Sequence, residues 1–379
     1  MEQVKIAHLT TVHPRGDTRI RIREVGSIAN ALDGPVALLV QDGRGNSVEE
    51  GGKIRIIDTG PQPPGRLARM TLGVFRMWRA VRLARPRLVH FHDPELIPLG
   101  MILKCFGHRV VYDVHEDLPR QVLTKYWLPG FARRPVSWVV SVIEWLAARV
   151  FDAIISVTPK IAERFPPRKT SIVQNFPIPS ELVVTEGVPY KQRPPHFAYV
   201  GGITRIRGIH EMIDAMTYTD RTGNKDILIR LAGTFQPFSL QSEIEALAGW
   251  QRVDFLGWVG RVQVAEILSN ALAGLVLFLP APNHMDAYPN KMFEYMSASL
   301  PVIVSDFPLW RHIVESAGCG LLVDPMNPRA IADAMLWILE HPDEAAAMGQ
   351  RGRLAVEKHY NWDSEADKLV TLYKKLLAT

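Results

Sequence analysis

Short apolar runs alternate with amphipathic stretches along almost the whole chain. In the first half, several runs are continuous in Val, Ile and Leu, as expected of parallel strands buried on both faces, and helical periodicity falls between them. This alternation predicts a βαβ series. The predicted strands are Val4–Thr10, Val36–Gln41, Ile54–Asp58, Leu88–His92, Val110–His115, Ala153–Val157 and Ser171–Gln174, and the predicted helices are Arg19–Leu32, Leu67–Leu83, Leu96–Cys105, Val136–Val150 and Pro159–Arg164.

A polar, proline-containing stretch from Pro177 to Pro195 interrupts the alternation and predicts an interdomain linker. A second series then follows. Its predicted strands are His196–Val200, Ile227–Leu231, Val253–Leu256, Leu275–Leu279, Pro301–Val304 and Gly320–Val323, and its predicted helices are Gly208–Thr217, Leu240–Gly249, Val262–Ala271, Asn290–Ala298, Leu309–Ser316, Pro328–Glu340 and, last in the chain, Ser364–Leu377. The fold class is therefore α/β, with two doubly wound domains, residues 1–185 and 190–361, facing a central cleft.

The composition agrees with a globular, two-domain protein, since 47% of the 379 residues are hydrophobic and 22% are charged. Cys105 and Cys319 lie far apart, which excludes a disulfide framework and a thiolate zinc site and fits a reducing cytoplasm. The first residues contain no signal-peptide core. The longest apolar stretch, Val136–Ala148, is about half a bilayer span and carries Glu144, so no transmembrane helix is expected.

The net charge of +5 is concentrated in one segment. Between Thr59 and His92 there are seven arginines and no acid. Helical periodicity places Leu67, Met70, Val74, Trp78 and Val81 on one arc and Arg66, Arg69, Arg76 and Arg79 on the other. This helix suits an anionic membrane or acceptor, and the alternative is a core-packed helix with solvated arginines. No finger, basic-zipper or RNP-like pattern is present, so no nucleic-acid partner is predicted.

The richest motif is Asp286-Ala-Tyr-Pro-Asn-Lys-Met-Phe-Glu294, which follows a predicted strand and a loop. Pro289 and Asn290 mark the start of a helix, where free N–H groups and the helix dipole favour a phosphate or sugar hydroxyls. Glu294, about one turn into the helix, can accept from a ribose diol, and Asp286 can accept from hexose hydroxyls. The alternative is an ordinary loop followed by a solvated helix acid.

A second motif, Tyr199-Val-Gly-Gly-Ile-Thr-Arg-Ile-Arg-Gly208, combines a strand, a glycine turn and two arginines. Gly201 and Gly202 allow a close backbone approach, and Arg205 and Arg207 can neutralise a diphosphate. Because the motif is neither a Walker A loop nor GxGxxG, it does not indicate ATP or NAD. The alternative is a surface turn with solvated arginines.

Polar segments also follow strands of the first half. In the loop Thr11–Arg19, Gly16 can bring backbone near a ligand, and Asp17 or, preferably, Thr18 caps the next helix. The strand ends His90-Phe-His-Asp-Pro-Glu95 and Tyr112-Asp-Val-His-Glu-Asp117 are expected to face the cleft, where a histidine can bind a sugar or move a proton. A metal site is an alternative that the absence of an HExxH-like spacing disfavours; its ligands would be His92, Asp93, His115 and Glu116. No nucleophile motif is present.

Together these residues resemble the retaining glycosyltransferases of family GT4, which have the GT-B fold. The resemblance covers nearly the full length. It implies that the nucleotide-sugar binds the C-terminal domain, that the acceptor binds the N-terminal domain, and that a last helix, 362–379, crosses back to the N-terminal domain. The stretches that carry it are His8-Leu-Thr, His13–Arg19, His90–Glu95, Tyr112–Glu116, Tyr199–Gly202 with Arg207-Gly208, Tyr288–Met296 and Leu300–Val304.

The family's E-x7-E motif falls on Asp286 and Glu294, so the first acid is one methylene shorter. Its phosphate-binding Arg…Lys pair falls on Gly202 and Arg207, and Arg205 replaces the missing first cation. The N-terminal glycine loop falls at Gly16, the cleft histidine at His115, and the base-contacting backbone at Phe255–Val259. The resemblance thus assigns catalysis to His115, Asp286, Glu294 and Arg207, and nucleotide-sugar binding to Gly16, Gly202, Arg205, Arg207, Gly257, Tyr288, Asn290, Lys291, Met292 and Glu294.

The resemblance also implies a mechanism. A nucleoside diphosphate leaves the anomeric carbon while Arg205, Arg207 and the helix start at Asn290–Met292 stabilise its charge. The acceptor hydroxyl attacks the same face, the leaving phosphate takes its proton, and His115 orients the sugar or acceptor. No metal or other cofactor is expected, because protein cations neutralise the diphosphate.

The expected function is transfer of a hexose from a UDP-sugar, or next from a GDP-sugar, to a glycan or lipid-linked acceptor in surface polysaccharide biosynthesis. Two alternatives remain: a nucleotide-sugar 2-epimerase on the same fold, and a non-catalytic sugar-nucleotide-binding protein. The expected location is the cytoplasm. Peripheral contact of the Arg66–Arg87 and Val136–Ala148 segments with an anionic inner membrane face is a separate hypothesis.

Overall fold

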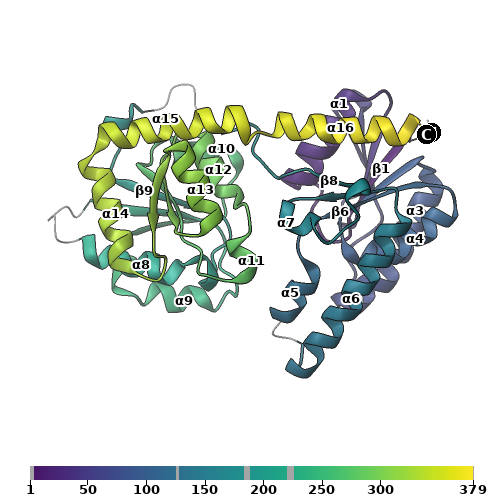
Figure 1. Cartoon of the computed structure of the whole chain (residues 1–379), viewed down its shortest axis with the longest axis horizontal. Coiled ribbons are helices and arrows are strands. Elements are labelled where there is room, and N and C mark those ends of the chain that lie inside the picture. The colour runs from purple at the N-terminus through teal and green to yellow at the C-terminus, as the bar shows by residue number, and fades with distance from the viewer. Residues whose placement is uncertain (1–3, 125–127, 183–187, 220–225, 379) are drawn as a thin grey trace. The chain divides into compact units, whose positions relative to one another are not determined.

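The computed structural model describes residues 4–124, 128–182, 188–219 and 226–378. The chain forms two compact units (Figure 1). Unit 1 comprises residues 1–175 together with 362–379, and unit 2 comprises residues 176–361. Both units place helices against a largely parallel sheet, which confirms the predicted α/β class with two doubly wound domains.

The boundary falls between residues 175 and 176 instead of near residue 185. Phe176 packs edge-on against Phe293 of unit 2, with ring centroids 4.9 Å apart. Tyr190 donates its hydroxyl to Leu272 O at 2.5 Å. The described part of the expected linker Pro177–Pro195 therefore belongs to unit 2, because aromatic side chains within it and just before it pack there.

In the described part of unit 1, the strand order is β3-β4-β2-β1-β5-β6-β7-β8, and every neighbouring pair is parallel except β3 with β4. The uninterrupted apolar runs are fully buried, as in Val36–Val40. The strands are β1 (Ile6–Leu9), β2 (Val36–Val40), β3 (Ser47–Glu49), β4 (Ile54–Asp58), β5 (Leu88–Phe91), β6 (Arg109–Val114), β7 (Ala153–Ser156) and β8 (Thr170–Ile172).

Helices of unit 1 fall largely where periodicity predicts them, although α5 and the short strand β3 were not expected. The predicted helix Val136–Val150 starts at Gly130 instead, as α6, and Pro135 is tolerated near the helix start because its ring removes only one intrahelical bond there. The helices are α1 (Gly26–Ala31), α2 (Gly65–Ala68), α3 (Val74–Ala84), α4 (Ile97–Cys105), α5 (Leu118–Thr124), α6 (Gly130–Val150), α7 (Pro159–Ala162) and α16 (Trp362–Ala378).

The predicted helix Leu67–Leu83 is interrupted by a wide π-helical turn, η3 (Arg69–Gly73), between α2 and α3. The extra residue in such a turn shifts the helical register. As a result, Leu67 and Met70 are exposed, although the uniform 100° pattern placed them on the buried arc with Val81. The same irregularity precedes α1, where η1 (Thr18–Val25) forms the start of the predicted helix Arg19–Leu32.

In the described part of unit 2, a parallel sheet has the order β11-β10-β9-β12-β13-β14. Its strands are β9 (His196–Val200), β10 (Leu228–Ala232), β11 (Val253–Gly257), β12 (Ala273–Val276), β13 (Val302–Ser305) and β14 (Gly320–Val323). Its helices are α8 (Ile209–Tyr218), α9 (Leu240–Glu245), α10 (Arg261–Ser269), α11 (Pro282–Met285), α12 (Asn290–Ser297), α13 (Pro308–Ala317), α14 (Pro328–Glu340) and α15 (Pro342–His359).

The order of the parallel strands reverses between β1 and β5 in unit 1 and between β9 and β12 in unit 2. Ligands of open α/β sheets bind beyond the carboxyl ends of the strands at such reversals. The polar motifs that follow these strands are therefore placed where each unit can bind a ligand. None of the helices in the described residues is long and apolar enough to cross a membrane.

Candidate functional site

A tight glycine turn follows β9 in unit 2. Gly201 has φ 124°, and a Cβ there would lie 3.6 Å from the Nζ atom of Lys291. Gly208, with φ 71°, ends the 3₁₀ turn η7 (Arg205–Arg207), and a Cβ on it would lie 1.9 Å from Leu277 O. The turn lies directly against the residue that follows β12, so only glycine fits at residue 208.

Lys291 lies beside this turn, in the first turn of α12. Its side chain is buried, and its Nζ atom, which has no hydrogen-bond partner among the described residues, lies 3.4 Å from the ring centroid of Tyr199. Burial, followed by the charge of Arg207, lowers the pKa of Lys291 well below its usual range. Buried amines normally have partners, so this group is suited to receive an anion.

Arg207 is the second cation at the turn. Its Nη1 atom donates to Gly202 O at 3.1 Å, and its guanidinium carbon lies 5.5 Å from the ring centroid of Phe278. The Nζ atom of Lys291 lies 5.5 Å from the same centroid, so one aromatic ring supports both cations. Arg205 does not join them, because it is exposed and paired with Glu243.

His284, in α11, was not singled out from the sequence. Its ring is half-buried and tilted against Phe278, with centroids 4.9 Å apart, and its Nδ1 atom is buried without a hydrogen-bond partner among the residues that the structure describes. Burial and, to a lesser extent, Arg207 lower the pKa of this imidazole. The neutral ring can accept or donate a hydrogen bond beside the cations. The sequence could have indicated His284 by its place soon after β12, a strand at the reversal of the strand order.

Glu294 is half-buried on α12 and forms an ion pair with Arg261, at 2.9 Å between Oε1 and Nη1. Arg261 begins α10 and also binds Glu181 at 2.7 Å. The sequence singled out Glu294 and missed Arg261, since nothing in the local pattern relates the two helices. The arginine fixes the direction of the carboxylate, and the other oxygen, Oε2, is the one that suits a diol.

The loop before α12 is anchored by Trp310, which donates its Nε1 proton to Ala287 O at 2.8 Å. Asp286 is exposed just before this anchor. Tyr288 stacks on Phe293 with a centroid distance of 6.1 Å and an interplanar angle of 20°. Asp286, the first acid of the predicted Asp286–Glu294 pair, is therefore followed by residues that are held in place by Trp310 and Phe293.

The remaining predicted residues of unit 2 differ in what they present. Asn290 is exposed at the first position of α12. Met292 has a fully buried side chain and donates its N–H to Pro289 O at 3.0 Å. Neither its side chain nor its amide is therefore available to bind a ligand. Gly257, with φ 64°, ends β11, where a Cβ would have open space, and its carbonyl accepts from Gly233 N–H at 2.7 Å.

In unit 1, His115 directly follows the β6 strand and is half-buried. Its Nε2 atom lies 2.8 Å from Asp113 Oδ2 and 3.3 Å from His92 Nδ1. Arg19 donates to both oxygens of Asp113, at 3.0 and 3.2 Å. Burial alone would raise the pKa of Asp113, but Arg19 and His115 lower it well below its usual range. An ionised carboxylate therefore orients His115.

The N-terminal loop reaches the same group of side chains. His13 lies 3.3 Å from Asp17 and has its ring centroid 5.4 Å from that of His115. The helix cap is Asp17, not Thr18, because its carboxylate accepts from two backbone N–H groups, each at 2.9 Å. Gly16 is exposed, with open space around its Cα.

The structure does not assemble the metal-ligand set considered from the sequence. His92 and His115 do meet, but Asp93 accepts instead from Thr10 Oγ1 at 2.8 Å and from the Thr11 N–H at 2.6 Å. Glu116 is exposed.

Two family models match the chain, one over each unit. Residues 19–175 match the glycosyl transferase 4-like domain, and residues 186–355 match the glycosyl transferases group 1 domain. The chain belongs to the family 4 glycosyltransferases. It is therefore an enzyme of the hexosyltransferase class, as the sequence motifs indicated.

Curated relatives agree with this assignment. The family 4 chain is 27% identical over 294 residues to D-rhamnosyltransferase WbpZ of Pseudomonas aeruginosa, covering 74% of this chain and 71% of the relative. It is 23% identical over 318 residues to a glycogen synthase of Mycobacterium tuberculosis, covering 80% and 70%.

Solved structures give the fold. A sucrose-phosphate synthase from Thermosynechococcus elongatus matches with a TM-score of 0.76 at 19% identity, over 99% of this chain and 100% of that one. Anabaena HepE, solved in complex with UDP-glucose, matches with a TM-score of 0.72 at 13% identity, over 98% and 100%. The glycosyltransferase has the two-domain GT-B fold, as expected.

Proposed function

We propose that this glycosyltransferase transfers a hexose, with retention of configuration, from a nucleotide-sugar that unit 2 binds at its glycine turn. The observation that carries the proposal is the buried Nζ atom of Lys291, which lies beside Gly201 and Arg207 and has no hydrogen-bond partner in the part of the chain that the structure describes. Two cations over one aromatic ring suit a diphosphate. UDP is favoured as the nucleotide, because HepE, which shares the fold, binds UDP and UDP-glucose.

In this proposal, the leaving diphosphate is stabilised by Arg207 and Lys291, and no metal is required for that step. Glu294, held by Arg261, binds the ribose diol. The acceptor hydroxyl attacks the face from which the diphosphate leaves, and that phosphate takes the hydroxyl proton. His115, oriented by Asp113, positions the sugar or the acceptor.

The acceptor is proposed to be a glycan or a lipid-linked glycan of a surface polysaccharide. The similarity to D-rhamnosyltransferase WbpZ supports a sugar-transfer role. Exposed apolar side chains on α6 support a membrane-associated acceptor, with Phe131 87% and Trp138 69% exposed. Both lie near the basic residues Arg133 and Arg134.

The test compares a lysine inside the proposed pocket with an arginine outside it. Lys291→Met removes the buried amine, and we expect UDP to bind about 10- to 100-fold more weakly, because a charge-assisted interaction with a phosphate is lost. Arg205→Gln is the matched control, since Arg205 is exposed and paired with Glu243. Titration calorimetry with UDP and GDP measures both affinities and the choice of base.

Two results would contradict the proposal. Equal loss of affinity in Arg205→Gln and Lys291→Met would show that only bulk positive charge matters, and unchanged affinity in Lys291→Met would place the diphosphate elsewhere. NMR of the nucleotide-sugar incubated without acceptor then separates transfer from 2-epimerisation, because an epimer forms only in the second case.

A further inference from the structure

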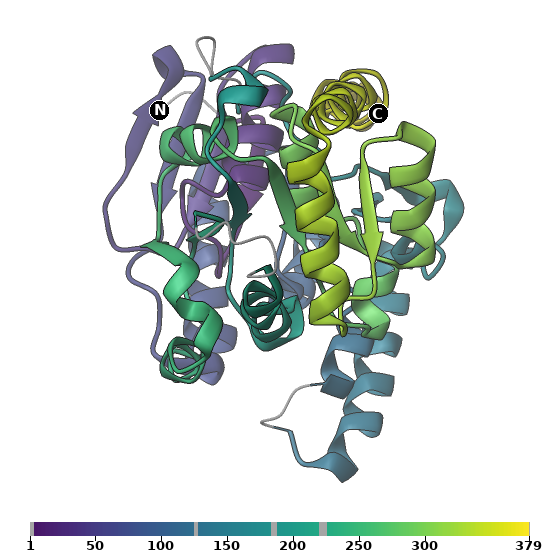
Figure 2. The same ribbon diagram turned by 90° about the vertical axis from the view of Figure 1, so that its left-hand side faces the viewer.

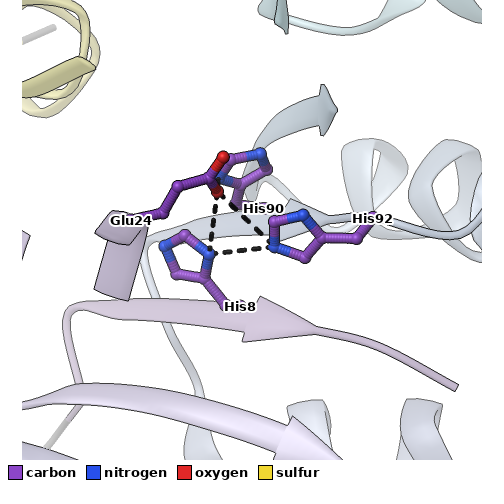
Figure 3. Close-up of side chains that lie close together, drawn as sticks. All are labelled: His8, Glu24, His90 and His92. Atoms are coloured by element: carbon purple, nitrogen blue, oxygen red, sulfur yellow. Dashed lines mark hydrogen bonds and ion pairs between the residues drawn. The ribbon is translucent and has the colours of Figure 1, made fainter. Parts of the chain in front are cut away.

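Three histidines and a glutamate meet inside unit 1, beneath one face of its sheet (Figure 3). β1 and β5 are parallel neighbours whose register pairs His8 with His90. His92 lies two residues after His90 and therefore points to the same face. Glu24 comes from η1, which covers that face. Three separate segments thus bring four metal-ligating side chains to one place.

The four side chains surround a single point. Glu24 Oε2 lies 3.9 Å from His8 Nδ1, 3.9 Å from His90 Nδ1 and 3.9 Å from His92 Nε2. The His8 Nδ1 and His92 Nε2 atoms are 3.0 Å apart, and all four atoms lie within 4.8 Å of one another. Ligands bound about 2.0–2.2 Å from a tetrahedral ion are themselves about 3.3–3.6 Å apart. The observed spacings bracket that value.

Atoms that would not touch the ion are held from outside. His92 Nδ1 lies 3.2 Å from Asp113 Oδ2, and His8 Nε2 lies 3.0 Å from the hydroxyl of Tyr373. Metal-binding histidines usually have such a carboxylate or oxygen partner on the other ring nitrogen, which fixes the tautomer. Glu24 Oε1 is likewise 3.0 Å from Arg19 Nη2.

Without an ion, the cluster leaves buried polar groups unsatisfied. His8, Glu24 and His90 are 0% exposed, and His92 is 2% exposed. Neither Glu24 oxygen makes a hydrogen bond of normal geometry among the described residues, although Arg19 forms an ion pair with the carboxylate and Asp113 lies close enough to interact with it. Buried polar atoms are rarely left so. A bound cation would satisfy the carboxylate, and the three imidazole nitrogens would exchange their present contacts for it.

We propose that unit 1 binds one divalent first-row transition-metal ion, Zn²⁺ foremost, through His8, Glu24, His90 and His92. Three imidazoles and one carboxylate suit Zn²⁺, and four protein ligands leave no open position, so the ion is structural and not catalytic. When the ion binds, His90 Nδ1 gives up its 2.6 Å contact with the Tyr373 hydroxyl. The hydroxyl keeps its contact with His8 Nε2. This proposal is independent of the nucleotide-sugar site.

The experiment uses the full chain, free of any affinity tag. Because the four ligands are buried, the ion should exchange only when unit 1 opens, so chelator is applied in mild denaturant and then removed. We expect about one Zn²⁺ per chain by elemental analysis, and a lower melting temperature after removal that added Zn²⁺ restores. Co²⁺ in its place should give the intense visible absorption of a four-coordinate ion.

Variants locate the ion. Glu24→Gln and His92→Gln should each weaken Zn²⁺ binding about 100-fold or more, since each loses a ligand. The exposed His312 gives the matched control His312→Gln, which should bind normally. His115→Gln should also bind normally, which distinguishes this site from the neighbouring His92–Asp113–His115 group.

Several results would overturn the proposal. The first is a chain that contains no Zn²⁺ and whose melting temperature does not rise when Zn²⁺ is added. The second is a Co²⁺ spectrum typical of six-coordination. The third is Zn²⁺ binding that is abolished by His115→Gln but unchanged by Glu24→Gln. If the ligand variants fail to fold, removal and return of the ion in the unaltered chain still decides the question. No change in melting temperature on removal and return would then refute the site.

Discussion

The surroundings of Lys291 limit what the glycine turn of unit 2 can bind. Its Nζ atom has an aromatic ring on one side and Arg207 nearby, and both burial and that arginine disfavour the ammonium form. A dianionic diphosphate reverses this balance, because it attracts both cations. The pKa of Lys291 should therefore rise when the nucleotide binds.

We accordingly predict that UDP binding takes up protons. Between the lowered pKa of the free protein and the raised pKa of the complex, Lys291 is neutral before binding and charged after it, so uptake approaches one proton per site. Within this window the affinity for UDP falls as the pH rises, and both below and above the window the uptake falls to zero. Calorimetry in buffers of different ionisation enthalpy, above about pH 7 where UDP itself is fully ionised, measures the uptake.

The control keeps the charge and removes the titration. Lys291→Arg is charged throughout the range, so it should bind UDP with no proton uptake from this position. If the unaltered enzyme takes up no protons at any pH, or the arginine variant takes up as many, Lys291 is not the group that titrates.

Single residues of the motifs could be predicted from the sequence, but their partners could not. Arg205 and Arg207 are two positions apart in a 3₁₀ turn, which directs their side chains to different sides, and only Arg207 lies at the glycine turn. The second cation, Lys291, comes from a helix about eighty residues later. The family resemblance already named Lys291 among the nucleotide-sugar-binding residues, but local spacing gave no sign that it, and not Arg205, lies beside Arg207.

At the scale of elements, the parallel strands and most helices follow from apolar periodicity, and α15 is the main omission. Its sequence contains Gly349 and Gly352, which weaken a helix prediction. Both are buried against neighbours: a Cβ on Gly349 would lie 2.2 Å from Ser299 O. The glycines that lower the helix propensity of this segment are thus the residues that let α15 pack closely.

We predict that Gly349→Ala destabilises unit 2 by about 1–3 kcal/mol, because the overlap with the Ser299 backbone outweighs a gain in helix propensity of about 1 kcal/mol. Gly130→Ala at the start of α6 is the control, since a Cβ there has open space and should be neutral or slightly stabilising. Urea unfolding followed by tryptophan fluorescence measures both. Equal stability of the two variants would mean that α15 moves aside without cost.

At the scale of the molecule, the positive charge and the exposed apolar residues of unit 1 occur on the same elements. The α5 and α6 helices extend beyond the rest of the unit (Figure 1 and Figure 2), and α6 exposes Phe131 and Trp138. The π-helical turn after α2 likewise leaves Leu67 81% exposed in the segment that carries the arginine cluster. Apolar side chains flanked by arginines suit the interface of an anionic bilayer.

We therefore predict that the enzyme floats with anionic vesicles at low salt, and less at high salt, because the arginines are screened. Phe131→Ser with Trp138→Ser should reduce binding at least about tenfold, since each large side chain contributes about 1.5–3 kcal/mol when buried in the interface. Phe238→Ser is the matched control, because Phe238 is 82% exposed on unit 2. If the Phe131→Ser, Trp138→Ser variant floats as well as the unaltered enzyme, the exposed side chains of α6 serve a different contact. The same follows if the unaltered enzyme does not float with anionic vesicles at low salt.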